Sequence, residues 1–112
     1  MARMMYCWRC RVDVPMLEEH EWDLVEPHLA NSIQQIKNYR EKHDCSLAVA
    51  RAQGYGLEAL RVYEQLTGYR ETNADALWHH RISQFGPPCR VCDKPLRTAS
   101  ATICAACGAK AL

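Results

Sequence analysis

The residues with the clearest chemistry in this chain are its seven cysteines, six of which stand in C-x-x-C pairs. The pairs are Cys7/Cys10, Cys89/Cys92 and Cys104/Cys107. A gap of two residues lets both thiolates of one turn reach the same metal ion, and two such turns supply a tetrahedral site. A disulfide framework is disfavoured because an odd number of cysteines would leave one thiol unpaired. The spacing therefore indicates metal binding.

The two C-terminal pairs are separated by eleven residues, which is typical of a zinc ribbon or knuckle. Glycine often follows such a turn, and Gly108 follows the second turn, whereas Asp93 takes that place after the first. Four thiolates leave no position for water, so we expect a structural zinc, with iron of the rubredoxin type as the rival metal. The predicted ligands are Cys89, Cys92, Cys104 and Cys107.

The N-terminal pair, in "CWRC", has no second half nearby. We predict that Cys7 and Cys10 bind a second metal with His79 or His80. Adjacent helical residues point about 100° apart, so at most one of these histidines is expected to face the core. Weaker candidates for the remaining ligands are His20, His28 and Cys45. There are two alternatives: Cys7 and Cys10 are simple buried thiols, or they share a metal with one C-terminal pair. A redox role is disfavoured because the sequence lacks the βαβ context in which such C-x-x-C pairs usually occur.

These ligands need a scaffold, and the sequence predicts a mostly α-helical one. Residues 4–16 are expected to form a hairpin around the first C-x-x-C. A long helix follows, with acidic residues at its start, where they complement the helix dipole. Pro27 predicts a kink or break near Glu26. Its apolar stripe is Trp22, Val25, Leu29, Ile33 and Ile36.

Three further helices are expected. Ser46 is the predicted N-cap of a short helix that ends before Gly54, and Gly68 ends the next one, over 57–67. Thr72 or Asn73 is expected to cap a third helix, which ends at Gly86. The residues expected to face inward are Leu57, Leu60, Tyr63, Leu66, Leu77, Trp78, Ile82 and Phe85.

The length of 112 residues favours a single domain with one modest core. We divide it into an N-terminal C-x-x-C knuckle (1–16), a helical body (17–86) and a C-terminal zinc ribbon (87–112). The expected fold is a single compact domain, mostly α with small zinc-ribbon or knuckle β-hairpins. Metal is a natural staple for so small a core.

Charge is distributed unevenly, although the net charge is only +1. Residues 17–26 carry five acidic residues and no Lys or Arg, so an acidic helix start could meet a basic partner. The ribbon carries four basic residues against Asp93. The predicted partner-binding residues are Glu18, Glu19, Glu21 and Asp23.

Several function classes are disfavoured. No phosphate loop, nucleophile triad or pair of carboxylates in a pocket is recognisable, so we expect no enzymatic activity. The N-terminus lacks an apolar run of signal-peptide length, and no window approaches a membrane span. The expected location is therefore the cytoplasm.

Three stretches, "CWRCRVDVPMLEEHEW", "YEQLTGYRETNADALWHHRISQFGPPC" and "CDKPLRT…CAACG", resemble a family of small bacterial zinc-ribbon proteins without an established activity. The resemblance covers well over half of the chain and leaves out residues 27–56. By analogy with other small bacterial proteins, it implies an immunity protein that binds and inhibits an antibacterial toxin such as a nuclease. The alternative is a zinc-ribbon protein associated with nucleic acid or transcription, with Arg90, Lys94 and Arg97 on phosphates.

Overall fold

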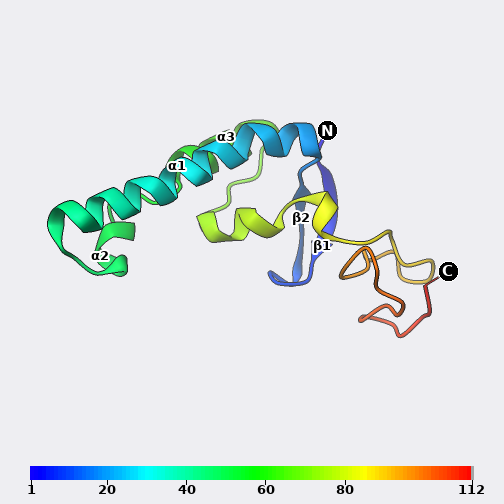
Figure 1. The fold of residues 1–112 in the computed structure, drawn as a ribbon. Coiled ribbons are helices and arrows are strands. Elements are labelled where there is room, and N and C mark those ends of the chain that lie inside the picture. Colours follow the sequence, from blue (N-terminus) through cyan, green and yellow to red (C-terminus); the bar gives the residue numbers. More distant parts are fainter. Residues whose placement is uncertain (112) are drawn as a thin grey trace.

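The computed structural model describes residues 1–111. The molecule is elongated, with extents of 53 × 26 × 19 Å (Figure 1). A two-stranded hairpin stands beside one end of a long helix, and the C-terminal segment continues from that same end (Figure 1). The elements are β1 (Arg3–Cys7), β2 (Val12–Met16), α1 (Glu19–His43), α2 (Leu47–Arg51), α3 (Leu57–Thr67), and two short 3₁₀ helices, η1 (Ala74–His79) and η2 (Ile82–Gln84). The predicted combination of helices with a small antiparallel hairpin is confirmed.

The hairpin pairs β1 with β2 in an antiparallel register from Arg3 opposite Met16 to Cys7 opposite Val12. The first C-x-x-C therefore forms the turn of this hairpin. Val14, Met16 and Cys7 are almost completely buried on one face. This face packs against partly buried side chains that include Ile82 and Phe85, so the hairpin is attached to the body by apolar contact as well as by its turn.

Helix α1 runs without a break through Pro27, so of the predicted kink or break near Glu26 the break is wrong. Proline removes one helical hydrogen bond, to the carbonyl group four residues earlier. That carbonyl belongs to Asp23, and both Asp23 and Pro27 are exposed, so water can satisfy the carbonyl. The apolar face of α1 is buried at Trp22, Val25 and Leu29, as predicted, and becomes half-exposed farther along the helix.

The main core lies between α1, α3 and η1. Tyr63 of α3 is fully buried there, and its hydroxyl donates a 2.5 Å hydrogen bond to the Pro15 carbonyl of β2. Gly68 ends α3 in a left-handed conformation, as predicted, and the Ser46 hydroxyl caps α2 by accepting from the Val49 amide. Leu57, the first residue of α3, was expected to face inward but is 66% exposed.

The predicted third helix over 72–86 is instead two 3₁₀ helices joined by an extended stretch. Leu17 pairs with this stretch in place of helical bonding: its amide donates to the His80 carbonyl (2.9 Å), and its carbonyl accepts from the Ile82 amide (2.9 Å). Asn73 caps η1 by accepting from the Asp75 amide. The break at His80 comes from a residue sixty positions away, which local periodicity cannot reveal.

The C-terminal ribbon has few backbone pairs of its own, at Pro88 with Pro95 and Ile103 with Lys110. It is joined to the body through Gly86, whose amide donates to the Leu96 carbonyl (2.8 Å). A Cβ atom at Gly86 would lie 2.3 Å from the Thr98 carbonyl oxygen, so only glycine fits this approach. Among residues 1–111, no helix combines the length and apolar character needed to cross a bilayer.

The Tyr63–Pro15 hydrogen bond predicts a stability effect. Tyr63→Phe keeps the packed ring but leaves the buried Pro15 carbonyl without its donor, so we expect the free energy of unfolding to fall by about 1–3 kcal/mol. Urea denaturation followed by circular dichroism measures the change. Tyr39→Phe, on the half-exposed distal part of α1, is the matched control and should change stability by less than about 0.5 kcal/mol. Equal effects of the two substitutions would contradict the role of the hydrogen bond.

Candidate metal centres

The four C-terminal cysteines come together in one cluster, with their sulfur atoms all within 4.8 Å of one another. The Sγ atoms of Cys89 and Cys107 are 3.6 Å apart, as are those of Cys92 and Cys104. A tetrahedral ion with metal–sulfur bonds of about 2.3 Å has sulfur–sulfur edges of about 3.8 Å. The cluster therefore has the dimensions of a tetrahedral four-thiolate site.

All three C-x-x-C turns have the same backbone geometry. The residue after the second cysteine has a positive φ in each turn: 60° at Arg11, 66° at Asp93 and 78° at Gly108. The amide of that residue donates to the carbonyl of the first cysteine, at 2.7 Å, 2.9 Å and 2.9 Å respectively. Because Arg11 and Asp93 adopt this conformation at a steric cost that glycine avoids, "CWRC" shares the turn geometry of the two C-terminal pairs and can present its sulfur atoms in the same way.

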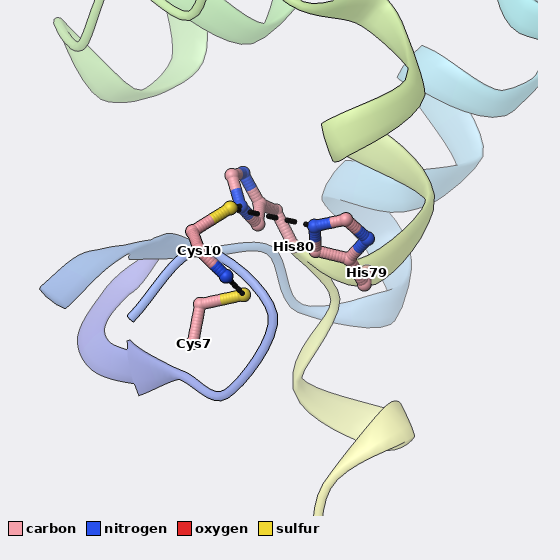
Figure 2. Close-up of side chains that lie close together, drawn as sticks. All are labelled: Cys7, Cys10, His79 and His80. Carbon is pink, nitrogen blue, oxygen red and sulfur yellow. Dashed lines mark hydrogen bonds between the residues drawn. The ribbon is translucent and has the colours of Figure 1, made fainter. Parts of the chain in front are cut away.

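The second cluster unites the N-terminal knuckle with the end of η1 (Figure 2). The Cys10 sulfur is 3.4 Å from His79 Nε2 and 3.3 Å from His80 Nε2. For metal–sulfur and metal–nitrogen bonds of about 2.3 and 2.05 Å, tetrahedral geometry requires a sulfur–nitrogen edge of about 3.5 Å. Cys7 and Cys10 thus gain two nitrogen donors, and the predicted pairing with the histidines has the geometry of a closed Cys₂His₂ site.

Both histidines take part, although we expected at most one to face the core. That expectation assumed an α-helix, in which neighbouring side chains diverge by about 100°. His80 instead leaves η1 with φ −97° and ψ 50°, and its ring turns toward the same sulfur as the ring of His79 (Figure 2). The alternative in which Cys7 and Cys10 share a metal with a C-terminal pair does not match this arrangement.

Electrostatics favour the ligand forms of both histidines and of Cys89. Burial lowers the pKa of His80 to about 4, and burial, together with the charge of Arg9, lowers the pKa of His79. Both rings are therefore neutral at pH 7 and can offer a lone pair from Nε2. In the other cluster, the amides of Cys92 and Val91 hold the pKa of Cys89 at about 6, which favours a thiolate.

Cys10 has the opposite tendency, because burial and the neighbouring Cys7 raise its pKa to about 11. Two adjacent thiolates are unfavourable there unless a cation neutralises them. Metal binding at this cluster must therefore displace protons, which couples the affinity of the site to pH.

Glu71 is a residue of this centre that sequence reasoning missed. Its Oε2 lies 4.0 Å from His80 Nδ1, a fully buried nitrogen with no hydrogen-bond partner among the described residues. Its Oε1 accepts from the amides of Thr72 and Asn73, both at 3.1 Å, so the carboxylate is fixed in place. A carboxylate that accepts from the far nitrogen of a ligand histidine sets the ring's tautomer and orientation. Glu71 precedes His79 by eight residues, and no sequence motif at this spacing identifies it as a neighbour of the ligand histidines.

The acidic helix start is largely occupied by contacts within the chain. Glu21 is only 5% exposed, and its carboxylate accepts from the amides of Glu18 (3.0 Å) and Ala2 (3.1 Å). Glu19 accepts two hydrogen bonds from Arg81, at 2.8 and 2.6 Å. Glu18 pairs with the N-terminal amine, whereas Asp23 is exposed. Three of the four residues predicted to bind a partner therefore already have partners.

Three weaker ligand candidates lie outside both clusters. Cys45 is half-buried after α1, where its carbonyl accepts from Arg40. His20 lies with Glu18 and Glu21 in a separate group, and the carboxylates of that group are engaged at the N-terminus of α1. His28 belongs to no ligand group found among residues 1–111.

No protein-family model, curated protein or solved structure matches this chain. The resemblance to small bacterial zinc-ribbon proteins therefore stays a prediction. The structure brings together two sets of four Cys or His side chains, each within ligand distance, and these suggest two metal sites.

The two clusters predict two metal ions per chain. Elemental analysis of the purified protein should give about two equivalents, because each cluster has four ligands. Cys7→Ser/Cys10→Ser and Cys104→Ser/Cys107→Ser should each retain about one equivalent and unfold at a lower temperature, because site formation is coupled to folding. Cys45→Ser is the control and should keep both ions. One equivalent in the wild type, unchanged in the Cys7/Cys10 double variant, would remove the N-terminal site.

Glu71 provides a second prediction, specific to the Cys₂His₂ centre. Glu71→Gln should weaken one of the two metal equivalents by about 10- to 100-fold, because His80 loses the carboxylate beside Nδ1. Competition with a chromogenic chelator measures both equivalents separately. Glu64→Gln removes an exposed carboxylate that pairs with Arg70, and it should leave both affinities unchanged. If Glu71→Gln releases neither ion more easily, the carboxylate does not support the histidine.

Proposed function

We propose that this chain is a non-catalytic zinc-binding protein, in which two structural zinc ions hold a small fold together so that it can bind a macromolecular partner. The observation that carries this proposal is the pair of clusters with four protein ligands each. A site with four protein ligands is typical of structural zinc, whereas a catalytic zinc keeps a position for water.

Zinc is favoured over iron by the N-terminal cluster. A four-thiolate set suits either zinc or a rubredoxin-type iron, so the C-terminal cluster alone does not discriminate. Two thiolates with two neutral imidazoles are a common structural zinc set.

Binding is favoured over catalysis because neither cluster has an open coordination position. Both sets use their donors on the metal, and four bonded ligands leave no water to activate. A fold that uses metal to fix exposed knuckles is suited to presenting a surface. We therefore place the function in contact with a partner.

An immunity protein that inhibits a bacterial toxin is one form of this function, and it stays a proposal. The acidic side chains best placed for a basic cleft are Asp23 and Glu26, which are exposed on the same part of α1. Because Glu18, Glu19 and Glu21 have partners within the chain, steering by this region is weaker than the sequence suggests.

The metal identity is tested directly. Protein produced in medium that contains both zinc and iron should carry about two equivalents of zinc and almost no iron by elemental analysis. Removal of zinc with a strong chelator should abolish cooperative unfolding, and added zinc should restore it, because binding and folding are coupled. Stoichiometric iron, or an intact cooperative transition without metal, would contradict a structural zinc protein.

A further inference from the structure

Two segments from opposite ends of the chain lie against each other where the hairpin meets the ribbon. They are residues 8–11 of the first knuckle and residues 94–97, which follow the second. The indole Nε1 of Trp8 donates a 2.9 Å hydrogen bond to the Pro95 carbonyl. Lys94 lies 4.1 Å from the centre of the Tyr6 ring, and the Arg97 guanidinium lies 5.7 Å from that of Trp8. We call Tyr6 and these two segments the basic–aromatic surface.

Four basic residues and no acidic residue occupy the two segments: Arg9, Arg11, Lys94 and Arg97. The three arginines are exposed, and Trp8 and Lys94 are half-buried. Lys94 and Arg97 lie over an aromatic pair, Tyr6 and Trp8, whose rings meet edge to face at 5.0 Å, and Arg9 and Arg11 follow Trp8 in the chain.

The charge of the whole chain is polarised in the same direction. The knuckle and the ribbon (1–16 and 87–112) hold seven Lys and Arg against two Asp, whereas the helical body (17–86) holds seven against eleven acidic residues. The net charge of +1 hides this separation. Because the hairpin and the ribbon lie at one end of the elongated molecule, that end is basic (Figure 1).

The metal knuckles fix this surface. Cys10 lies inside the first segment, and Cys92 comes two residues before the second. Arg11 has its positive φ because the knuckle requires it. A backbone held in this way loses little conformational freedom when a ligand binds, which favours affinity.

From this juxtaposition we propose that the basic–aromatic surface binds single-stranded nucleic acid. The inference rests on the proposed function and names the partner. Arginine and lysine neutralise phosphates, and aromatic rings stack on unpaired bases, a combination found in single-strand binding proteins. A duplex hides the faces of its bases and could use only the charges. An acidic protein would likewise match the charges and leave the aromatic pair without a specific role.

A cleft of about 790 Å³ beside the surface indicates where a base can lie. Tyr6 and Lys94 line it together with apolar side chains such as Met5 and Phe85, and its volume is within the range of small-ligand sites. Asp13 and Asp93 also line it, and they repel phosphate. The strand's phosphates therefore follow Arg9, Arg11 and Arg97, and an unstacked base enters the cleft.

The test is fluorescence anisotropy of zinc-loaded protein with labelled 12-nucleotide oligo(dT), oligo(U) and a 12-base-pair duplex at physiological salt. Both single strands should bind at least tenfold more tightly than the duplex. Arg9→Glu/Arg97→Glu should weaken single-strand binding at least tenfold and reduce its dependence on salt. Lys37→Glu/Lys42→Glu makes the same charge change at exposed sites on distal α1 and should alter affinity less than twofold.

Substitutions of Trp8 distinguish the contribution of base stacking from that of charge. Trp8→Leu should weaken binding about tenfold, whereas Trp8→Phe, which keeps an aromatic face, should retain most of the affinity. Each variant is first shown to hold two zinc ions, so that misfolding is distinguished from lost contacts. Protein with two zinc ions that binds no single strand, or that loses affinity equally in both charge-reversed variants, overturns this inference and leaves the proposed function standing. Wild-type protein that holds no zinc would instead overturn the proposed function. If the protein binds no oligonucleotide and instead binds an acidic protein through Arg9 and Arg97, the inference is also wrong, and the ligand of this surface is a protein.

Discussion

The contact on which the rest of this structure depends is the meeting of the Cys7/Cys10 turn with His79 and His80. The four side chains come from a hairpin and from the end of a 3₁₀ helix about seventy residues later, so the cluster joins the first unit of the chain to the helical body. His80 is fully buried at this junction. A chain of this length has little apolar surface to bury, and an ion bound at this point would replace core that the sequence lacks.

The same junction explains the irregular backbone around it. His80 and Ile82 bond to Leu17, which interrupts a segment whose apolar periodicity is helical. The interruption turns the His80 ring toward Cys10 and places its Nδ1 near Glu71. A regular helix would present only one of the two histidines, so the loss of helical bonding is what completes the set of four donors.

Charged residues at the start of α1 form ion pairs within the fold, whereas those of the knuckle turn and the ribbon remain exposed. Three acidic residues at the start of α1, Glu18, Glu19 and Glu21, hold the N-terminus and Arg81, so little of their charge faces solvent without a partner. The basic residues of the knuckle turn and the ribbon are mostly exposed, and two of them, Lys94 and Arg97, lie over the rings of Tyr6 and Trp8. The knuckle turns thus have two consequences, because the backbone that aims the cysteines inward also projects the adjacent arginines outward.

The sequence by itself determined the parts of this protein that depend on short-range spacing. The C-x-x-C turns, the hairpin around the first of them, the Ser46 cap and the Gly68 terminus follow from residues within a few positions of one another. It also indicated His79 and His80 as partners for Cys7 and Cys10. Only the tertiary structure decided that both histidines are used, that Glu71 lies behind one of them, and that Glu21 is buried. Each of these depends on segments far apart in the chain, whose approach is fixed by packing and backbone pairing such as that of Leu17 with Arg81, and local periodicity carries no information about either.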